Sequence, residues 1–212
     1  MITKYLKNIK RNLSFYKRSR VLNKEKDQML DKMYLFFKHQ KITYWLEYGT
    51  LLGAVRNNKI IPHDYDVDLG LLQSQWSIGI RNELKKLGFQ FIREIAVDGI
   101  VYEESYKFNG ITIDFFYCSI IDNIVNTPVF RPFKNMTWDE SLKQKGGFEL
   151  YLFKNPYNGV QEILFENEYW NVPKNSNLHL ISYYGNNYMI PEKNWKGENA
   201  AVAMDRVGRV SY

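Results

Sequence analysis

The sequence predicts a mixed α/β or α+β domain with one central sheet, and three observations support this class. Segments with helical spacing of apolar residues alternate with segments rich in β-branched and aromatic residues. The dipeptide Asn109-Gly110 separates two strand-like segments, which is a strong signal of a β-hairpin. A chain of 212 residues that is 45% hydrophobic and 16% aromatic can bury a full core, which excludes a mainly disordered protein.

The N-terminal part contains few Pro and Gly residues and is expected to be helical. Asn23 is expected to cap a helix whose apolar residues lie between positions 29 and 37. Residues 42–48 are mainly β-branched or aromatic and predict a strand. Gly49-Thr50 ends this strand, and residues 51–55 suit one or two helical turns.

The middle of the chain predicts most of the sheet. Residues 66–72 alternate acidic and apolar side chains, as expected of a strand with one face on a functional site. Residues 74–87 suit a helix that ends at Gly88. Further strands are expected at 89–95, 100–108 and 111–118.

The later part of the chain gives weaker signals. We expect residues 119–147 to be irregular, because they contain Pro128, Pro132 and Gly146-Gly147, and a strand to follow at 148–153. No internal boundary stands out. We therefore expect a basic amphipathic N-terminal arm over 1–26, one domain over 27–195 and an unassigned tail over 196–212.

Cysteine and apolar content exclude several classes of protein. Cys118 is the only cysteine, which excludes a disulfide scaffold and makes a reducing compartment the simplest expectation. One cysteine and three scattered histidines argue against a closed structural zinc site. No run approaches the roughly 20 apolar residues of a spanning helix. The first residues alternate charged and apolar groups too often for a signal peptide.

Positive charge is concentrated at the N-terminus. Residues 1–26 hold nine Lys or Arg and one acid, Glu25, whereas the remainder holds 20 basic and 22 acidic residues. Three interpretations stay open for this arm: a helix on an anionic membrane surface, formed by residues 1–22, an ordinary surface helix packed on the body, and the least favoured, nucleic-acid contact. A stripe of apolar residues follows helical spacing, namely Ile2, Tyr5, Leu6, Ile9, Leu13 and Tyr16.

Three acids occupy alternate positions in the middle of the chain. On a strand, Asp64, Asp66 and Asp68 share one face and lie within about 7 Å of each other. Carboxylates this close repel strongly in a dry site. A divalent cation would compensate, and hard oxygen ligands favour Mg²⁺, Mn²⁺ or Ca²⁺ over zinc. The alternative, an edge strand with its acids in water, is disfavoured by apolar neighbours such as Val67 and Leu69.

A phosphate-binding turn is expected just before these acids. Gly49 at a strand end lets backbone amides approach a phosphate, and the Thr50 hydroxyl can donate to it. Together with Asp66-Val67-Asp68 on the next strand, this is the two-part layout of a nucleotidyltransferase site. Arg56 and Lys59 lie between the two parts and would neutralise phosphate charge, unless they are ordinary solvated loop cations.

Asp114 is one acid inside an otherwise apolar strand. An unpaired buried carboxylate is costly, so this residue requires a reason. We expect Asp114 to join Asp66 and Asp68 around a metal and to act as the base for an acceptor hydroxyl. The alternative is a structural aspartate with satisfied hydrogen bonds.

Two motifs resemble the LicD/fukutin family, in its fukutin-related form. They are Gly-Thr-Leu-Leu-Gly-Ala-Val-Arg at 49–56 and Ile-Ile-Pro-His-Asp-Tyr-Asp-Val-Asp-Leu-Gly at 60–70. The resemblance covers roughly residues 28–192. Looser matches follow at Asp114, Phe165-Glu166, Val172-Pro173, Tyr184-Gly185 and Met189-Ile190-Pro191.

The resemblance implies a polymerase-β-like nucleotidyltransferase fold, with a mixed central sheet flanked by helices. It also implies metal-dependent transfer of a phospho-alcohol, such as phosphocholine or ribitol phosphate, from a CDP-linked donor to a hydroxyl of a cell-surface glycan, with release of CMP. The implied cofactor is Mg²⁺, with Mn²⁺ as a substitute. A bacterial enzyme of the cytoplasm is expected, held at the inner face of the membrane by residues 1–22 if the acceptor is lipid-linked.

The family's metal-binding acids match Asp66 and Asp68, with Asp64 beside them, and its third acid matches Asp114. His63 stands where the family more often has Trp, and it would line the donor pocket or contact phosphate, unless it is a mere substitution without a role. Tyr65 is one of four aromatic residues that would stack on the donor, unless they belong to the core. The zinc-binding cysteines of some animal relatives are absent.

Two rival functions remain from the sequence. A true nucleotidyltransferase, moving an NMP to a small molecule, a protein or RNA, shares both motif parts but releases pyrophosphate rather than CMP. A non-catalytic binding module with the same fold is disfavoured, because Asp66, Asp68 and Asp114 are all intact.

Overall fold

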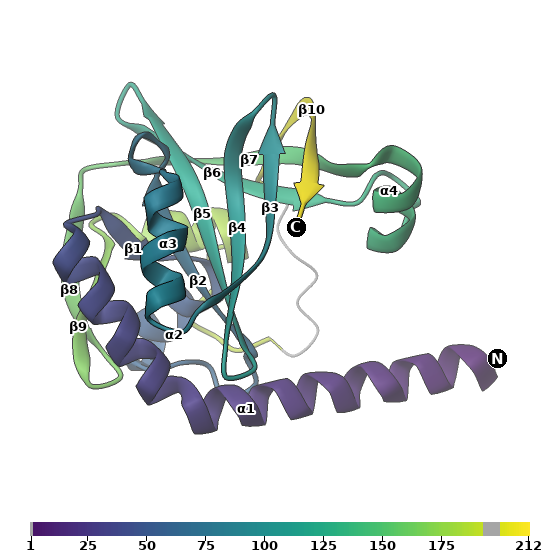
Figure 1. Cartoon of the computed structure of the whole chain (residues 1–212), viewed down its shortest axis with the longest axis horizontal. Helices are drawn as coiled ribbons and strands as arrows, with labels where there is room; N and C mark the ends of the chain where they lie inside the picture. The colour runs from purple at the N-terminus through teal and green to yellow at the C-terminus, as the bar shows by residue number, and fades with distance from the viewer. Residues whose placement is uncertain (1, 193–199) are drawn as a thin grey trace.

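The computed structural model describes residues 2–192 and 200–212, with side chains from Leu13 onward in the first helix. A large, mainly antiparallel sheet forms the centre of the domain (Figure 1). The helices are α1 (Ile2–Gln40), α2 (Tyr48–Asn57), α3 (Ile78–Lys86), α4 (Trp138–Lys145), α5 (Ser176–Tyr184) and the short 3₁₀ helix η1 (Gln73–Gln75). The strands are β1 (Tyr44–Leu46), β2 (Asp66–Leu72), β3 (Gln90–Val97), β4 (Ile100–Phe108), β5 (Ile111–Ile121), β6 (Ile124–Arg131), β7 (Gly147–Pro156), β8 (Val160–Phe165), β9 (Glu168–Pro173) and β10 (Val202–Ser211).

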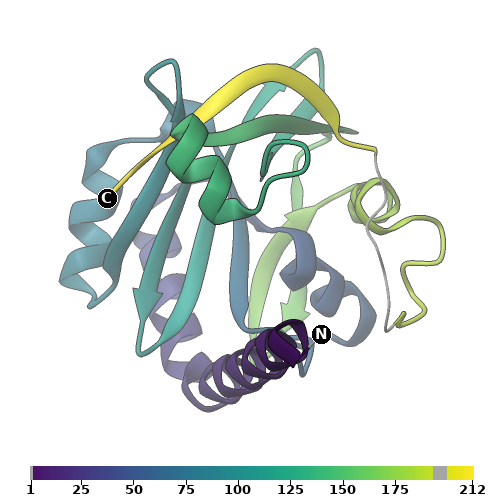
Figure 2. The same ribbon diagram turned by 90° about the vertical axis from the view of Figure 1, so that its right-hand side faces the viewer.

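Six of these strands form a closed antiparallel barrel in the order β5-β4-β3-β10-β7-β6 (Figures 1 and 2). The ring closes because the last residues of β5 pair with the first residues of β6, with Ser119 opposite Asn126. β2 runs parallel to β5 outside the ring, and β1 pairs antiparallel with β2. β8 and β9 form a separate hairpin that packs against β1 through β9.

The expected polymerase-β-like nucleotidyltransferase fold, with helices flanking a mixed central sheet, is therefore wrong. The ring closes through two strands that the sequence did not predict. β6 lies in the stretch 119–147, where Pro128, opposite Leu152 of β7, argued against a strand. β10 lies in the tail left unassigned over 196–212 and pairs with both β3 and β7. The expected domain boundary after residue 195 lies outside the described residues.

The elements predicted between residues 42 and 118 are confirmed in order and type. β1 lies within the predicted strand at 42–48, and β2 matches the predicted 66–72. The β4–β5 hairpin turns at Asn109 (φ 45°) and Gly110 (φ 91°), both in the left-handed region that an Asn-Gly turn provides. The predicted helix at 74–87 is split into η1 and α3.

Helix α1 is continuous across residue 26, where the sequence suggested the end of an arm. Asn23, expected to be a cap, lies inside this helix, and its side-chain amide donates to the carbonyl oxygens of Ser19 (2.8 Å) and Pro62 (3.2 Å). The second half of α1 packs into the main core through Leu22, Met29, Leu30, Met33, Phe36 and Phe37. In Figure 1 the first half of α1 continues beneath the ends of β4 and β5 and past the sheet.

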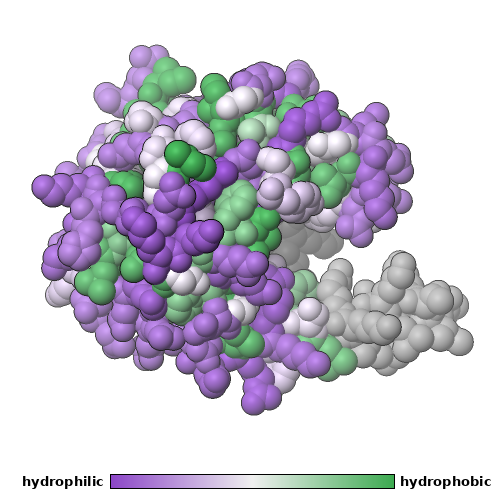
Figure 3. Space-filling model, viewed as in Figure 1, coloured by the Kyte–Doolittle hydropathy of each residue, from purple (hydrophilic) through white to green (hydrophobic). Residues whose placement is uncertain are grey.

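The main core lies between α1, α3 and one face of β2, β4 and β5. β2 contributes Val67, β4 contributes Tyr106 and β5 contributes Phe115, and all three side chains are buried. Apolar residues at the surface are interspersed with hydrophilic ones on the face shown in Figure 3. Within the described ranges, no helix has both the length and the apolar character needed to span a bilayer.

Candidate active site

Two neighbouring strands carry three of the predicted acids. Asp66 and Asp68 lie on β2, and Asp114 lies on β5. The strands run parallel, with Asp68 opposite Asp114 and Asp66 opposite Thr112. Because side chains alternate along a strand, the acids share the face turned away from the main core. The structure thus places these carboxylates next to each other, half-buried and still in contact with solvent.

The backbone of β2 is fixed by the residues that lead into α2. The Glu47 amide N–H donates to the Asp68 carbonyl oxygen (3.0 Å), and the Asp68 N–H donates to Thr50 Oγ1 (2.9 Å). The Thr50 side chain is buried. Its oxygen therefore positions the Asp68 backbone, whereas the sequence suggested direct contact with a phosphate.

Glycines in α2 allow the acid-bearing loop to lie close to the helix. A Cβ at Gly49 would lie 3.2 Å from Asp64 Oδ2, so Asp64 sits against the first turn of α2. A Cβ at Gly53 would lie 2.4 Å from the Lys59 carbonyl oxygen. Only glycine therefore fits at this position, where the loop after α2 passes close to the helix. The positive end of the α2 dipole therefore faces the Asp64 carboxylate, an arrangement that also suits a phosphate.

The carboxylates repel one another. Burial raises the pKa of Asp66 to about 7, and the charges of Asp114 and Asp64 add to the rise. Burial, followed by the charge of Asp66, raises the pKa of Asp68 well above its usual range. Burial also raises the pKa of Asp64 to about 6. The site therefore favours added positive charge, from protons or from a cation.

The donor set fits Mg²⁺ or Mn²⁺ by its chemistry, since carboxylate oxygens on adjacent strands are the ligands that hard cations prefer. The geometry is not already that of a metal centre. No three His, Cys, Asp or Glu side chains in the described parts of the chain are grouped so that they could hold a metal ion.

The predicted phosphate-binding residues differ in their surroundings. The Arg56 guanidinium donates to the carbonyl oxygens of Tyr188 and, at 3.3 Å, of Ile190, although its charge still lowers the pKa of Asp64. Lys59 and His63 are exposed, and the charge of His63 also lowers the pKa of Asp64. Tyr65 is half-buried between Asp64 and Asp66. The roles of these residues stay predictions.

Sequence reasoning missed two residues that position Asp114. The Ser105 hydroxyl on β4 donates to Asp114 Oδ1, and Arg93 Nε on β3 donates to Ser105 Oγ (3.2 Å). Ser105 was accessible to prediction, because a two-residue turn at Asn109-Gly110 pairs Ser105 with Asp114. Arg93 was not, because a register shift between Ile95 and Ala96 lies between the β3–β4 turn and the pairing of Arg93 with Ser105.

The charges of Arg93 and Arg18 both lower the pKa of Asp114, against the dominant effect of burial, which raises it. Arg18 lies on α1, within the segment that the sequence assigned to a separate arm. No sequence signal links this residue to the acids.

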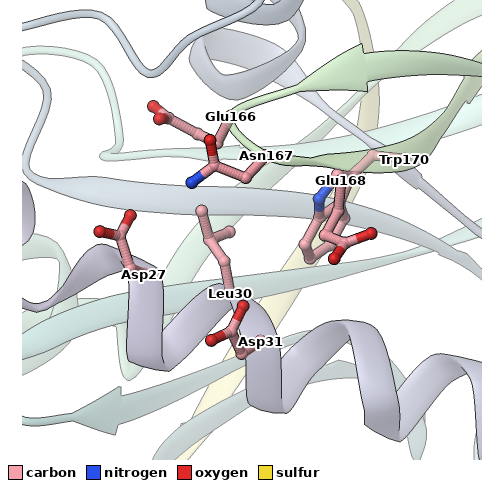
Figure 4. Close-up of a pocket in the computed structure, with 7 residues that line it drawn as sticks. All are labelled: Asp27, Leu30, Asp31, Glu166, Asn167, Glu168 and Trp170. Atoms are coloured by element: carbon pink, nitrogen blue, oxygen red, sulfur yellow. The ribbon is translucent and has the colours of Figure 1, made fainter.

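The small cavity shown in Figure 4 is not part of this site. It has a volume of about 20 Å³, room for about one water molecule, and is lined by α1 residues that include Asp27 and Asp31 and by the tip of the β8–β9 hairpin. Glu166 at that tip accepts hydrogen bonds from the Ile60 N–H (2.9 Å) and from Lys26 Nζ. Glu166 therefore ties α1 and the hairpin to the loop that leads to Asp64, which is a structural role.

A family model described as LicD/FKTN/FKRP, nucleotidyltransferase domain, matches residues 41–175. The chain belongs to this family. The match to the LicD family extends from just before β1 to the end of the β8–β9 hairpin and contains Asp64, Asp66, Asp68 and Asp114. Helix α1 and strand β10 lie outside it.

Individual relatives of this LicD-family chain match shorter segments. The chain is 67% identical over 76 residues to ribitol 5-phosphate transferase FKRP of Mus musculus, covering 32% of this chain and 15% of the mouse protein. It is 41% identical over 71 residues to an uncharacterized protein of Rickettsia prowazekii, covering 34% of this chain and 23% of that protein. The chain thus aligns with less than a quarter of the length of these relatives, which include bacterial and mammalian proteins.

Proposed function

We propose that this chain is a metal-dependent transferase that moves a phospho-alcohol from a CDP-linked donor to a hydroxyl of a cell-surface glycan and releases CMP. The observation that carries the proposal is the cluster of Asp64, Asp66, Asp68 and Asp114 within the segment that matches the LicD family. The mouse relative is named a ribitol 5-phosphate transferase, which makes ribitol phosphate the first group to test and phosphocholine the second.

Asp66 and Asp68 would hold Mg²⁺ or Mn²⁺, with Asp64 and Asp114 as further ligands. When bound, the cation would neutralise the charge that develops as the diphosphate of the donor is cleaved. The turn at Gly49-Thr50 would place the α2 N-terminus beside the phosphates. The carboxylates alone would repel a doubly charged diphosphate, so donor binding is expected to require the cation.

Asp114 would take up the proton of the acceptor hydroxyl. Ser105 donates to one of its carboxylate oxygens and so holds the group in one orientation. In the proposed step, the acceptor hydroxyl oxygen forms a bond to the phosphorus of the transferred group, and its proton passes to Asp114. The bond between that phosphorus and the CMP oxygen breaks, and CMP leaves with the electron pair.

The direct test is release of CMP from CDP-ribitol, CDP-choline and CDP-glycerol in the presence of Mg²⁺. We expect CMP from one of these donors, including slow release to water when no acceptor is added, and loss of the signal with EDTA. The rival nucleotidyltransferase would instead release pyrophosphate from an NTP and no CMP from the donors. Pyrophosphate release in an NTP panel would therefore replace this proposal.

The first half of α1 is proposed to contact an anionic membrane surface. Leu13 and Tyr16 of the apolar stripe are 54% and 63% exposed, so these two positions are not used for packing on the body. Basic residues flank them on the same helix, an arrangement typical of interfacial helices. Such contact would place the enzyme at the inner face of a bacterial membrane, where a lipid-linked glycan acceptor would be reached.

Liposome co-sedimentation tests this contact. A chain lacking residues 1–12 and carrying Leu13→Ser and Tyr16→Ser is expected to lose most binding to vesicles that contain anionic lipid, while its CMP release in solution persists. This variant keeps Phe15, Ser19 and the later residues of α1 whose contacts with the domain are described. Equal sedimentation of both chains would refute the membrane proposal and leave α1 as a surface helix.

A further inference from the structure

One face of α1 is docked on the loop that carries the acids. Ser19 Oγ donates to the carbonyl oxygen of Pro62 (2.8 Å), and the Phe15 ring stacks on Tyr65 at 5.1 Å between centroids. Asn23, one turn after Ser19, donates to the same Pro62 oxygen. These residues recur at helical spacing on a face different from the apolar stripe. The helix is thus fixed to the segment between Pro62 and Asp66.

This docking places the Arg18 guanidinium at the edge of the acid cluster. Its central carbon lies 3.9 Å from the centroid of the Tyr65 ring, and Nη2 lies 3.4 Å from Thr112 Oγ1. Thr112 is the residue opposite Asp66 in the strand register. The cation–π contact with Tyr65 restrains the guanidinium, and the long hydrogen bond to Thr112 leaves most of its five donors uncommitted.

The Arg18 guanidinium lies close to the acids, but its charge is not balanced by an ion pair with any of them in the described parts of the chain. Its charge lowers the pKa of both Asp66 and Asp114. Yet in the ranges that the structure describes, Arg18 forms no ion pair with a carboxylate, whereas Arg81, Arg93 and Arg206 each do. A half-buried guanidinium with free donors beside an acidic site is suited to an anion that the site brings in.

We propose that Arg18 binds the diphosphate of the nucleotide-linked donor, so that α1 completes the substrate site from outside the segment that the LicD family model matches. The inference rests on the proposed function, because that function supplies the diphosphate. A cation held by Asp66 and Asp68 would balance part of the diphosphate charge. The planar Arg18 fork would donate hydrogen bonds to the phosphate oxygens and balance the charge that the cation leaves.

The test compares Arg18→Gln with Arg20→Gln, the same substitution two residues further along α1. Arg20 is exposed and lies 5.9 Å over Tyr16, away from the acids. Binding of inorganic diphosphate with Mg²⁺ is measured by calorimetry, and KM and kcat for the donor by CMP release. Loss of charge-assisted hydrogen bonds predicts that Arg18→Gln weakens diphosphate binding and raises KM by roughly 10- to 100-fold, while Arg20→Gln changes either by less than about threefold.

Two further variants separate binding from support of the fold. Arg18→Lys keeps the charge but not the planar fork, so it should recover part of the lost affinity. Phe15→Ala loosens the stacking on Tyr65 but keeps the guanidinium, so it should weaken diphosphate binding less than Arg18→Gln does. Equal losses in Phe15→Ala and Arg18→Gln, with equal falls in melting temperature, would overturn the proposal in favour of a docking role.

The outcomes also distinguish this inference from the proposed function. If the wild-type chain releases CMP and Arg18→Gln behaves like Arg20→Gln, the function stands and the Arg18 proposal falls. If no donor yields CMP but diphosphate binding still depends on Arg18, the anion site stands and the CDP-linked donor falls.

Discussion

Asp66→Asn is expected to lower Mg²⁺-dependent CMP release by at least about 100-fold, because loss of a carboxylate ligand removes the charge that holds the cation. The same variant is expected to be more stable than the wild type at pH 8 without divalent cations. The folded chain raises the pKa of Asp66 to about 7, mainly by burial and then by the charge of Asp114. Removing this charge relieves a repulsion that the charge of Arg18 offsets only in part. Steady-state kinetics and thermal unfolding measure the two effects.

The pH dependence of this gain has a defined sign. In the unfolded chain Asp66 loses its proton near pH 4, whereas the folded chain retains it up to about pH 7. Protons are therefore taken up on folding in this window, and the free energy of unfolding of the cation-free wild type falls as pH rises from about 4 to about 7. Asp66→Asn lacks this contribution, so its advantage in melting temperature should shrink as pH is lowered toward 4.

Asp122→Asn is the matched control for this prediction. Asp122 is exposed in the β5–β6 turn with φ 50°, a conformation that Asn also adopts readily. We expect it to leave both CMP release and the pH profile unchanged. An Asp66→Asn variant that kept full activity would exclude Asp66 as a metal ligand. A melting temperature below that of the wild type at pH 8 would contradict the repulsion described for the site.

Gly70→Ala is expected to lower the free energy of unfolding by about 2–3 kcal/mol, the cost of overpacking a core position. A Cβ at Gly70 would lie 2.3 Å from Trp45 Nε1, and the indole is fully buried, so it has no space to move. Trp45 Nε1 also donates to Glu47 Oε2 (2.7 Å). Displacing the indole would leave the buried Glu47 carboxyl, whose pKa burial already raises to about 7, without this donor. Urea unfolding measures the loss.

Gly79→Ala provides the same change at a different kind of position. Gly79 is exposed within α3, and an added Cβ would meet only Ser77 Oγ, at 3.3 Å. Alanine favours a helix more than glycine does, so this variant should be neutral or gain up to about 1 kcal/mol. Gly70→Ala with the stability of the wild type would mean that Trp45 can repack, and that the contact between β1 and β2 is looser than its geometry indicates.

Local signals were enough to predict the strands that carry the acids. The alternation at 66–72 gave β2 and the common face of Asp66 and Asp68, and Asn109-Gly110 gave the β4–β5 hairpin. The closure of the barrel could not be predicted from such local signals. Its closure depends on β6, which contains a proline, and on β10, whose partners β3 and β7 are distant in sequence. Pairing between distant segments leaves no mark in the periodicity of either one.

The same division applies to the candidate site. Asp64, Asp66, Asp68 and Asp114 were found because acids at strand spacing in apolar surroundings require an explanation. Arg18 was not found, because its position depends on how α1 crosses the end of the sheet, and a basic residue on a basic helix carries no special signal.

The way in which the barrel closes has a consequence for biosynthesis. The β4–β5 hairpin, which holds Ser105 and Asp114, joins neighbouring segments and can form early on the nascent chain. The ring stays open between β3 and β7 until residues 202–211 have left the ribosome, because β10 is the strand that links them. The acid cluster can therefore be assembled while two sheet edges are still unpaired, and those edges are where a stalled or truncated nascent chain would associate with a neighbour.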